Sequence, residues 1–166
     1  MHSVYRELIE RQFARLTEDI SAESVLPPPV MSGTRVVVWV EGIRKSGERD
    51  RYVLCIDTDR FPVEPFDVGF IDPSLPAAQW DTAELKNPRF FPNDGDDGQQ
   101  RMKTAFHTNP RVFICIQPGF TREYFAHHRD ESWNPHAMTL AHIVQQVRNV
   151  ITGPRYVGPM WEKKTT

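Results

Sequence analysis

Three consecutive prolines, Pro27 to Pro29, limit the fold of this chain more than any other feature of its sequence. Proline lacks an amide hydrogen and clashes with the preceding helical turn, so no helix runs through such a triplet. Before the prolines, apolar residues recur at helical spacing with charged residues between them: Tyr5, Ile9, Phe13, Leu16 and Ile20. The sequence therefore predicts an amphipathic helix first and an extended segment after the prolines.

Three apolar runs after the extended segment have the composition of β-strands. The first, residues 35–42, is centred on a β-branched stretch that contains Trp39. A polar, glycine-containing turn at 45–50 separates it from the second run, 52–57, and this arrangement is typical of an antiparallel hairpin. The third run, 67–71, follows a connection that holds two prolines. We therefore expect a meander of neighbouring strands directly after the helix.

The second half of the chain alternates between irregular and regular segments. Residues 72 to about 104 carry prolines, glycines and an acidic cluster at 94–98, which favours a long surface insertion. The cluster lacks the downstream glutamate and the flanking helices of a calcium loop, so we expect a solvated loop there. Asn134 followed by Pro135 predicts the start of a helix, and Gly153 before Pro154 predicts its end. This order of elements indicates an α+β fold.

Composition excludes several classes of protein. The chain has 166 residues and a net charge of −2, which suits one globular domain and provides no general attraction for nucleic acid or an anionic membrane. Its apolar stretches are far shorter than the ~20 residues of a membrane span, and residues 1–15 do not form a secretory signal. The two cysteines, Cys55 and Cys115, form no CxxC pair. We therefore expect a cytoplasmic protein with no nucleic-acid or membrane partner.

Both cysteines lie in apolar runs, where a cysteine commonly serves as a small buried side chain. Cys55, in the run 52–57, is expected to be a core strand residue. The residues alone leave two interpretations of Cys115 open, a buried position and a zinc ligand. Zinc accepts cysteine sulfur and histidine nitrogen, and a candidate set exists at His107, Cys115, His127 and His128, although its spacing matches no compact finger.

The order of four short motifs resembles the ubiquitin-conjugating enzyme family. The connection 61–66 (Phe-Pro-Val-Glu-Pro-Phe) is similar to the one before the third strand of the family's meander. His107-Thr108-Asn109 is similar to the family's His-Pro-Asn, with threonine in place of proline, and Asn109 lies six residues before Cys115. Residues 114–116 (Ile-Cys-Ile) are similar to the catalytic strand, and 133–135 (Trp-Asn-Pro) to the Trp-Ser-Pro before the long helix.

The resemblance implies a fold for the whole chain. It implies a single ubiquitin-conjugating-enzyme-like domain over residues 1–166, with an N-terminal helix, a four-stranded antiparallel meander and a C-terminal helix after the cysteine loop. The insertion at about 72–104 is additional to these elements of the family fold. A compact bacterial relative, encoded with an activating enzyme and a ubiquitin-like protein, is the kind of member that this length suggests.

The resemblance also implies an activity. Cys115 accepts a ubiquitin-like protein from an ATP-dependent activating enzyme as a thioester and passes it to an amine, a lysine of a protein substrate. Asn109 stabilises the oxyanion, Asp130 and His128 are candidates for activating the amine, and no cofactor is needed. A non-catalytic variant of the fold that only binds a ubiquitin-like protein is an alternative, as is the zinc site.

Overall fold

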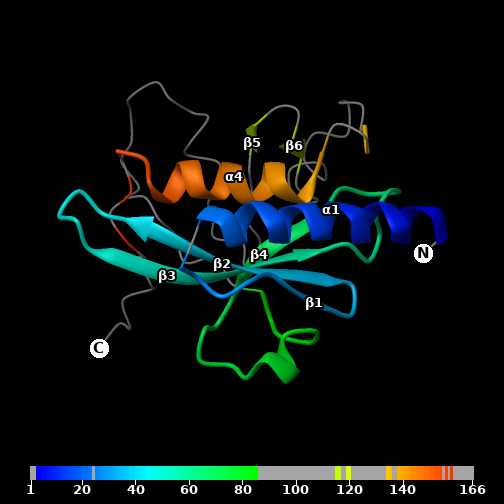
Figure 1. Cartoon of the computed structure of the whole chain (residues 1–166), viewed down its shortest axis with the longest axis horizontal. Helices are drawn as coiled ribbons and strands as arrows, with labels where there is room; N and C mark the ends of the chain where they lie inside the picture. The colour runs from blue at the N-terminus through cyan, green and yellow to red at the C-terminus, as the bar shows by residue number, and fades with distance from the viewer. Residues whose placement is uncertain are drawn as a thin grey trace, which may run out of the picture.

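The fold was obtained as a computed structural model, which describes residues 3–23, 25–85, 115–116, 119–120, 134–135, 138–154, 156 and 158. It is an α+β arrangement with an N-terminal helix, a four-stranded antiparallel sheet and a C-terminal helix (Figure 1), which confirms the predicted class. The elements follow one another as α1 (Ser3–Glu23), β1 (Val30–Ser32), β2 (Arg35–Ile43), β3 (Arg49–Asp57), β4 (Asp67–Ile71), the short 3-10 helix η1 (Ala77–Gln79), β5 (Cys115–Ile116), β6 (Gly119–Phe120) and α4 (Leu140–Ile151).

The sheet is a simple meander in which each strand pairs with the next, in the order β1-β2-β3-β4. Strand β4 has the predicted bounds, but β3 begins at Arg49, three residues earlier than the apolar run indicated. The reason is a set of cross-strand charges, because Glu41 on β2 pairs with both Arg49 and Arg51 on β3. Gly47 has a φ of 87°, which closes the shortened turn without steric strain.

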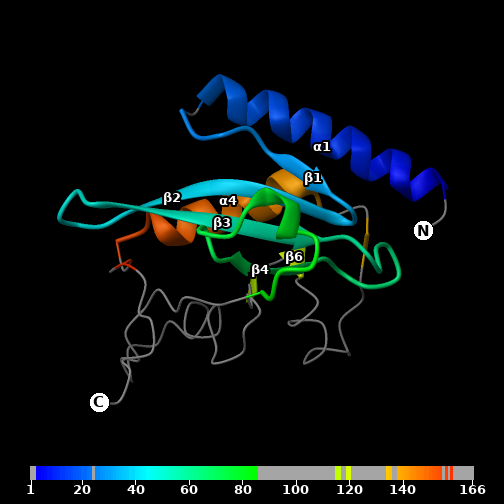
Figure 2. The ribbon, with the colours of Figure 1, turned by 90° about the horizontal axis from the view of Figure 1, so that it is seen from below.

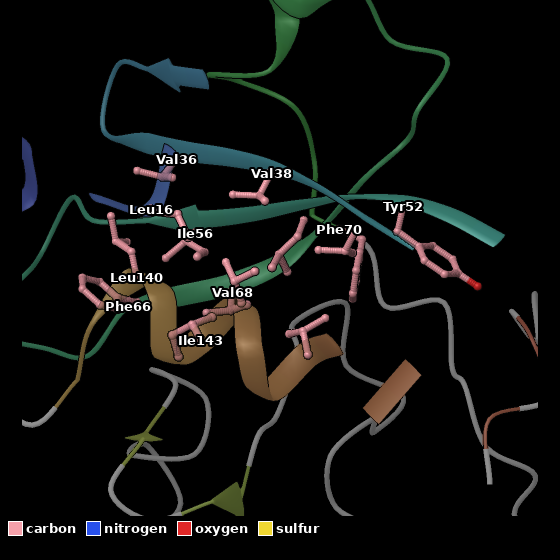
Figure 3. Packing of buried hydrophobic residues seen from close by; sticks show 14 of the residues in the cluster. Leu16, Val36, Val38, Tyr52, Ile56, Phe66, Val68, Phe70, Leu140 and Ile143 are labelled. Atoms are coloured by element: carbon pink, nitrogen blue, oxygen red, sulfur yellow. The ribbon is translucent and has the colours of Figure 1, made fainter. Parts of the chain in front are cut away.

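The two long helices lie on the same face of the sheet and build the main core there (Figure 1). Of the five helical positions predicted on α1, Ile9, Leu16 and Ile20 are buried and the other two are partly buried against the same core. Alternate residues of the central strands point toward α4, where Leu140 and Ile143 meet them (Figure 3). Apolar side chains repeat every two residues along the strands and about every 3.6 residues along the helices. Each element therefore turns one apolar side toward the same core.

Helix α4 begins five residues later than the first predicted helical position, Pro135. Its N-cap is Thr139, whose hydroxyl accepts a hydrogen bond from the His142 backbone N–H at 3.1 Å. The side-chain oxygen of Gln12 on α1 accepts from the Leu140 N–H at 2.9 Å, so a second free amide of the first turn is satisfied by another helix. The predicted end is confirmed, since α4 stops at Ile151 just before Gly153 and Pro154.

The opposite face of the sheet is covered by residues 72–85, here called the covering segment (Figures 1 and 2). Trp80 and Ala83 of this segment pack on Val37, Val53, Cys55 and Ile71 to form a second apolar cluster. The Arg35 guanidinium, paired with Asp57 at 3.1 Å, donates to the Trp80 carbonyl at 3.0 Å and the Ala83 carbonyl at 2.7 Å. The start of the expected surface insertion is thus a packed layer, and residues 86–104 lie outside the described part of the chain.

Two glycines allow close approach of flanking segments to the sheet. A Cβ at Gly69 on β4 would lie 2.7 Å from the Leu85 Cβ of the covering segment, and a Cβ at Gly42 on β2 would lie 2.6 Å from the Tyr156 ring. Real Cβ atoms essentially never come this close to another atom, so a larger residue at either position would force its neighbour to shift. Within the described ranges no helix combines the length and the apolar composition needed to cross a membrane.

Candidate functional site

Cys115 is the first residue of β5, a two-residue strand that pairs with β6 in antiparallel fashion. In this pair Cys115 lies opposite Phe120, and Ile116 lies opposite Gly119. The family resemblance implies a strand at 114–116, and the described part of it, Cys115–Ile116, is a strand. In chain order, the cysteine follows the whole four-stranded sheet and precedes α4. Along the chain, Cys115 therefore lies between the meander and the last helix.

Cys55 has an environment that makes it chemically inert. It is 0% exposed on β3, between Val37 on β2 and Gly69 on β4. Burial raises the pKa of its thiol to about 12, although the nearby Arg35 lowers it in part. The thiolate is the nucleophilic form of cysteine, and at pH 7 a thiol with that pKa is ionised in only about one molecule in 10⁵. The predicted role of Cys55 as a core strand residue is confirmed.

The other residues assigned to the site lie outside the described ranges. They are His107, Asn109, His127, His128, Asp130 and Trp133. The structure therefore does not bring them together with Cys115 or separate them from it, and their roles stay predictions. Among the described residues, no group of three or more histidines, cysteines and carboxylates could hold a metal ion. The zinc alternative, whose histidines are all outside those ranges, stays a prediction as well.

The connection before β4, which carries part of the family resemblance, joins α1 to the sheet. Its Phe61–Pro62 peptide bond is cis. The Phe61 ring stacks on Phe66 with centroids 4.8 Å apart, and Tyr5 of α1 meets it edge-on at 6.3 Å. Such aromatic pairs contribute about 0.5–1.5 kcal/mol beyond their buried area. The motif thus positions the first helix against the entry of the last meander strand.

A partly buried polar cluster beside the turn that joins β2 to β3 was not anticipated from the sequence. Arg44 binds the Asp50 carboxylate through two hydrogen bonds of 2.7 Å each. The Tyr156 hydroxyl donates to Asp50 Oδ2 at 2.6 Å and lies 2.5 Å from the Tyr52 hydroxyl. Because Tyr156 has already donated its only hydroxyl proton, Tyr52 is the donor of that second bond. The cluster attaches the chain after α4 to the sheet.

The protonation states of this cluster do not change near neutral pH. Partial burial raises the pKa of Asp50, but hydrogen bonds from Arg44 and Tyr156 lower it by more, so the net shift is downward. Burial raises the pKa of both Tyr52 and Tyr156 above the ordinary tyrosine value, and the bond to Asp50 raises that of Tyr156 further. A general acid or base works best with a pKa near the operating pH. The cluster is therefore suited to holding structure and unsuited to proton transfer.

Comparison of the chain with models of known protein families, with curated proteins and with solved structures finds no match. The functional interpretation thus depends on the residues themselves, on the order of the elements and on the contrast between the two cysteines. The signal that could have revealed the polar cluster is weak, since Tyr52 and Tyr156 are 104 residues apart in the sequence.

Proposed function

We propose that this protein is a carrier enzyme of the ubiquitin-conjugating type. Cys115 accepts a ubiquitin-like protein from an ATP-dependent activating enzyme and transfers it to an amine, a lysine of a protein substrate. The observation that carries the proposal is the place of Cys115 in β5, after a helix and a four-stranded antiparallel sheet and before α4. The ubiquitin-conjugating fold presents its nucleophile in that order, and this finer fold assignment is part of the proposal.

The chemistry proceeds in two acyl transfers. The Cys115 thiolate attacks the thioester carbonyl on the activating enzyme, a new C–S bond forms, and the activating enzyme's cysteine leaves as a thiolate. An amine then attacks the Cys115 thioester, a C–N bond forms, and Cys115 leaves as a thiolate while the amine gives up a proton. Asp130 or His128 accepts that proton. ATP is consumed by the activating enzyme, and this chain contributes no cofactor.

Asn109 supplies the stabilisation of the charged intermediate in this scheme. Attack on a thioester places negative charge on the carbonyl oxygen, and a side-chain amide donates a hydrogen bond to it. One preorganised donor of this type contributes about 3 kcal/mol, which is about a hundredfold in rate. Asn109→Ala should therefore slow transfer to the amine much more than it slows loading of Cys115.

The contrast between the cysteines supports the assignment of the nucleophile. Cys55 is excluded by its complete burial and its raised pKa. Cys115 is then the only other cysteine in the sequence. A reducing cytoplasm, expected from the low cysteine count, keeps its thiol available for acyl transfer.

The test is a loading assay with an activating enzyme and a ubiquitin-like protein from the same genome. The protein is incubated with both and with ATP, then run on a non-reducing gel. We expect an adduct that disappears on addition of thiol, that is absent in Cys115→Ala and that persists in the matched control Cys55→Ala. An adduct that survives in Cys115→Ala, or that maps to Cys55, contradicts the proposal.

The same assay separates the two alternatives. Binding of the ubiquitin-like protein without any thiol-sensitive adduct would identify a non-catalytic binding variant. One zinc ion per chain, lost in Cys115→Ala and in a His127→Ala/His128→Ala variant, would identify a metal site. Either result replaces the proposed function.

A further inference from the structure

His142, on the first turn of α4, has a ring nitrogen that the proposed mechanism does not use. Its Nε2 atom is shielded from solvent and has no hydrogen-bond partner among the residues that the structure describes. A shielded polar atom without a partner costs free energy, so its presence in a folded protein needs a reason. The backbone around it is fixed, because the His142 N–H donates to the Thr139 hydroxyl at 3.1 Å. The Leu140 N–H donates to the side chain of Gln12 on α1 at 2.9 Å.

Helix α4 turns this imidazole away from the sheet. Successive residues advance about 100° around a helix, and the buried Ile143 and Val147 mark the side of α4 that packs on the main core. His142 falls on the opposite side, together with Gln145 and Asn149. The side chains of these two residues are exposed and bound to each other at 2.8 Å. Within the described residues, this outer side of α4 is therefore covered at its first turn and open further along.

The β5–β6 pair lies on the same side of the helix as His142. Figure 1 shows both strands on the side of α4 away from the sheet, and Figure 2 shows them on the flank away from α1. Ile116, Gly119 and Phe120 of this pair have no polar atom in their side chains. Cys115 is thus the one residue of the pair whose side chain can bind an imidazole nitrogen, the thiol as a donor and the thiolate as an acceptor.

No other described charge faces the first turn of α4 from the surrounding elements. Strands β5 and β6 carry no charged side chain besides a Cys115 thiolate. Arg148 is the one charged residue of α4 apart from His142, and it lies six residues further along. On α1, the charged residues nearest to Gln12 are Arg11 and Arg15, and both are exposed. Among the described groups, Cys115 is therefore the one that can exchange a proton with His142.

We propose, on the basis of the function proposed above, that His142 activates Cys115 by accepting the proton of its thiol. The proton moves from Sγ to Nε2, which leaves a thiolate beside an imidazolium. This thiolate attacks the thioester carbonyl on the activating enzyme. When the amine later displaces Cys115, the imidazolium stabilises the departing thiolate. His142 thus acts on the nucleophile, whereas Asp130 or His128 acts on the amine.

The test measures how fast iodoacetamide alkylates Cys115 in the native protein as a function of pH, with no partner protein present. A neighbouring imidazolium lowers a thiol pKa from about 8.5 to about 6.5. At about pH 5.5 the thiolate is then about a hundredfold more abundant, and its lower intrinsic nucleophilicity offsets about eightfold of this gain. We therefore expect wild type to react about tenfold faster than His142→Gln at about pH 5.5 and about sixfold slower at about pH 9.

The variants separate proton transfer from packing. His142→Gln keeps a polar side chain that does not accept the thiol proton. Gln145→Ala, on the same side of α4, is the matched control and should leave the rate profile unchanged. A packing role for His142 would change the rate by one factor at every pH, so the crossing of the two profiles identifies proton transfer. Cys55 reports folding in the same samples, because it is fully buried in the native state.

A second measurement leaves His142 intact, and it decides the question if His142→Gln exposes Cys55 to labelling. The NMR signals of the His142 ring protons are followed as a function of pH in wild type and in Cys115→Ala. Because the two groups share a proton, we expect a step with the midpoint of Cys115 alkylation in wild type. This step should be absent in Cys115→Ala.

The outcomes distinguish this inference from the function on which it rests. A wild-type alkylation midpoint at or above about 8.5, the ordinary thiol value, overturns the inference. Profiles that do not cross in a folded His142→Gln, or ring signals that ignore Cys115, also overturn it. A thiol-sensitive adduct on Cys115 in the ATP-dependent loading assay leaves the proposed function in place in each of these cases. Crossing profiles without such an adduct support the pair and overturn the proposed function.

Discussion

Replacing Tyr156 with phenylalanine tests how the chain after α4 is attached to the sheet. Tyr156 is 1% exposed, and its hydroxyl donates to Asp50 at 2.6 Å and accepts from Tyr52 at 2.5 Å. Tyr156→Phe keeps the ring that packs over Gly42 and removes only the oxygen. Any loss of stability therefore reports the two hydrogen bonds.

The expected loss follows from the kind of bond that is removed. A hydrogen bond to a charged group contributes about 1.5–3 kcal/mol, and a neutral pair contributes about 1 kcal/mol. Asp50 retains both bonds from Arg44, which offsets part of the cost. We expect the free energy of unfolding to fall by about 2 kcal/mol, which lowers Tm by about 4–8 °C in a chain of this length. The control Tyr52→Phe removes only the neutral bond and should cost about half as much.

The pH dependence of this loss has a defined sign in acid. The pKa of Asp50 is lowered in the folded state, so the stabilisation it contributes is present above its unfolded pKa, near pH 4, and is lost as the pH falls through the folded value. Tyr156→Phe removes one of the bonds that lower this pKa. The difference between wild type and variant should therefore be constant from about pH 5 to 8 and become smaller in acid.

At alkaline pH, the contribution of the two tyrosines to stability is lost as the pH rises. The pKa values of Tyr52 and Tyr156 are raised by burial, so their contribution is complete below the ordinary tyrosine value of about 10 and is lost as the pH rises above it. Urea unfolding at about pH 3, 7 and 10.5 measures all three regimes. A change below about 0.5 kcal/mol at pH 7 would refute the reasoning, because surface substitutions produce changes of that size.

Three further predictions concern the sheet and α4. Iodoacetamide should label Cys115 in the native protein and Cys55 only after denaturation, as peptide mass mapping will show; native labelling of Cys55 would contradict its burial. Gly69→Ala should destabilise the protein by about 1–3 kcal/mol, because its Cβ meets Leu85 at 2.7 Å; equal urea midpoints for variant and wild type would exclude that contact. Thr139→Ala should cost about 1 kcal/mol through loss of the N-cap bond, whereas Thr139→Ser should preserve it.

Part of the candidate site was predictable because its signals are local. The resemblance of residues 114–116 to a family motif implied a strand at Cys115, and residues 115–116 are a strand. The inertness of Cys55 was suggested by its apolar neighbours, but its pKa depends on burial beneath the covering segment, which no local pattern indicates. The start of α4 was misjudged because Asn134 and Pro135 resemble a helix start locally, whereas the amide of Leu140 is satisfied by Gln12 from another helix.

The sequence by itself determined the helix before the prolines, three strands of the meander (β2, β3 and β4) and the end of α4. These follow from hydrophobic period and from residues that stop helices, and both effects act within a few positions along the chain. Only the tertiary structure decided which segments cover the sheet. The return of Trp80 to its second face and the attachment of Tyr156 to Asp50 join residues far apart in sequence. Such contacts form only where the folded chain brings distant residues together. A local hydrophobic pattern contains no information about which distant residues will meet.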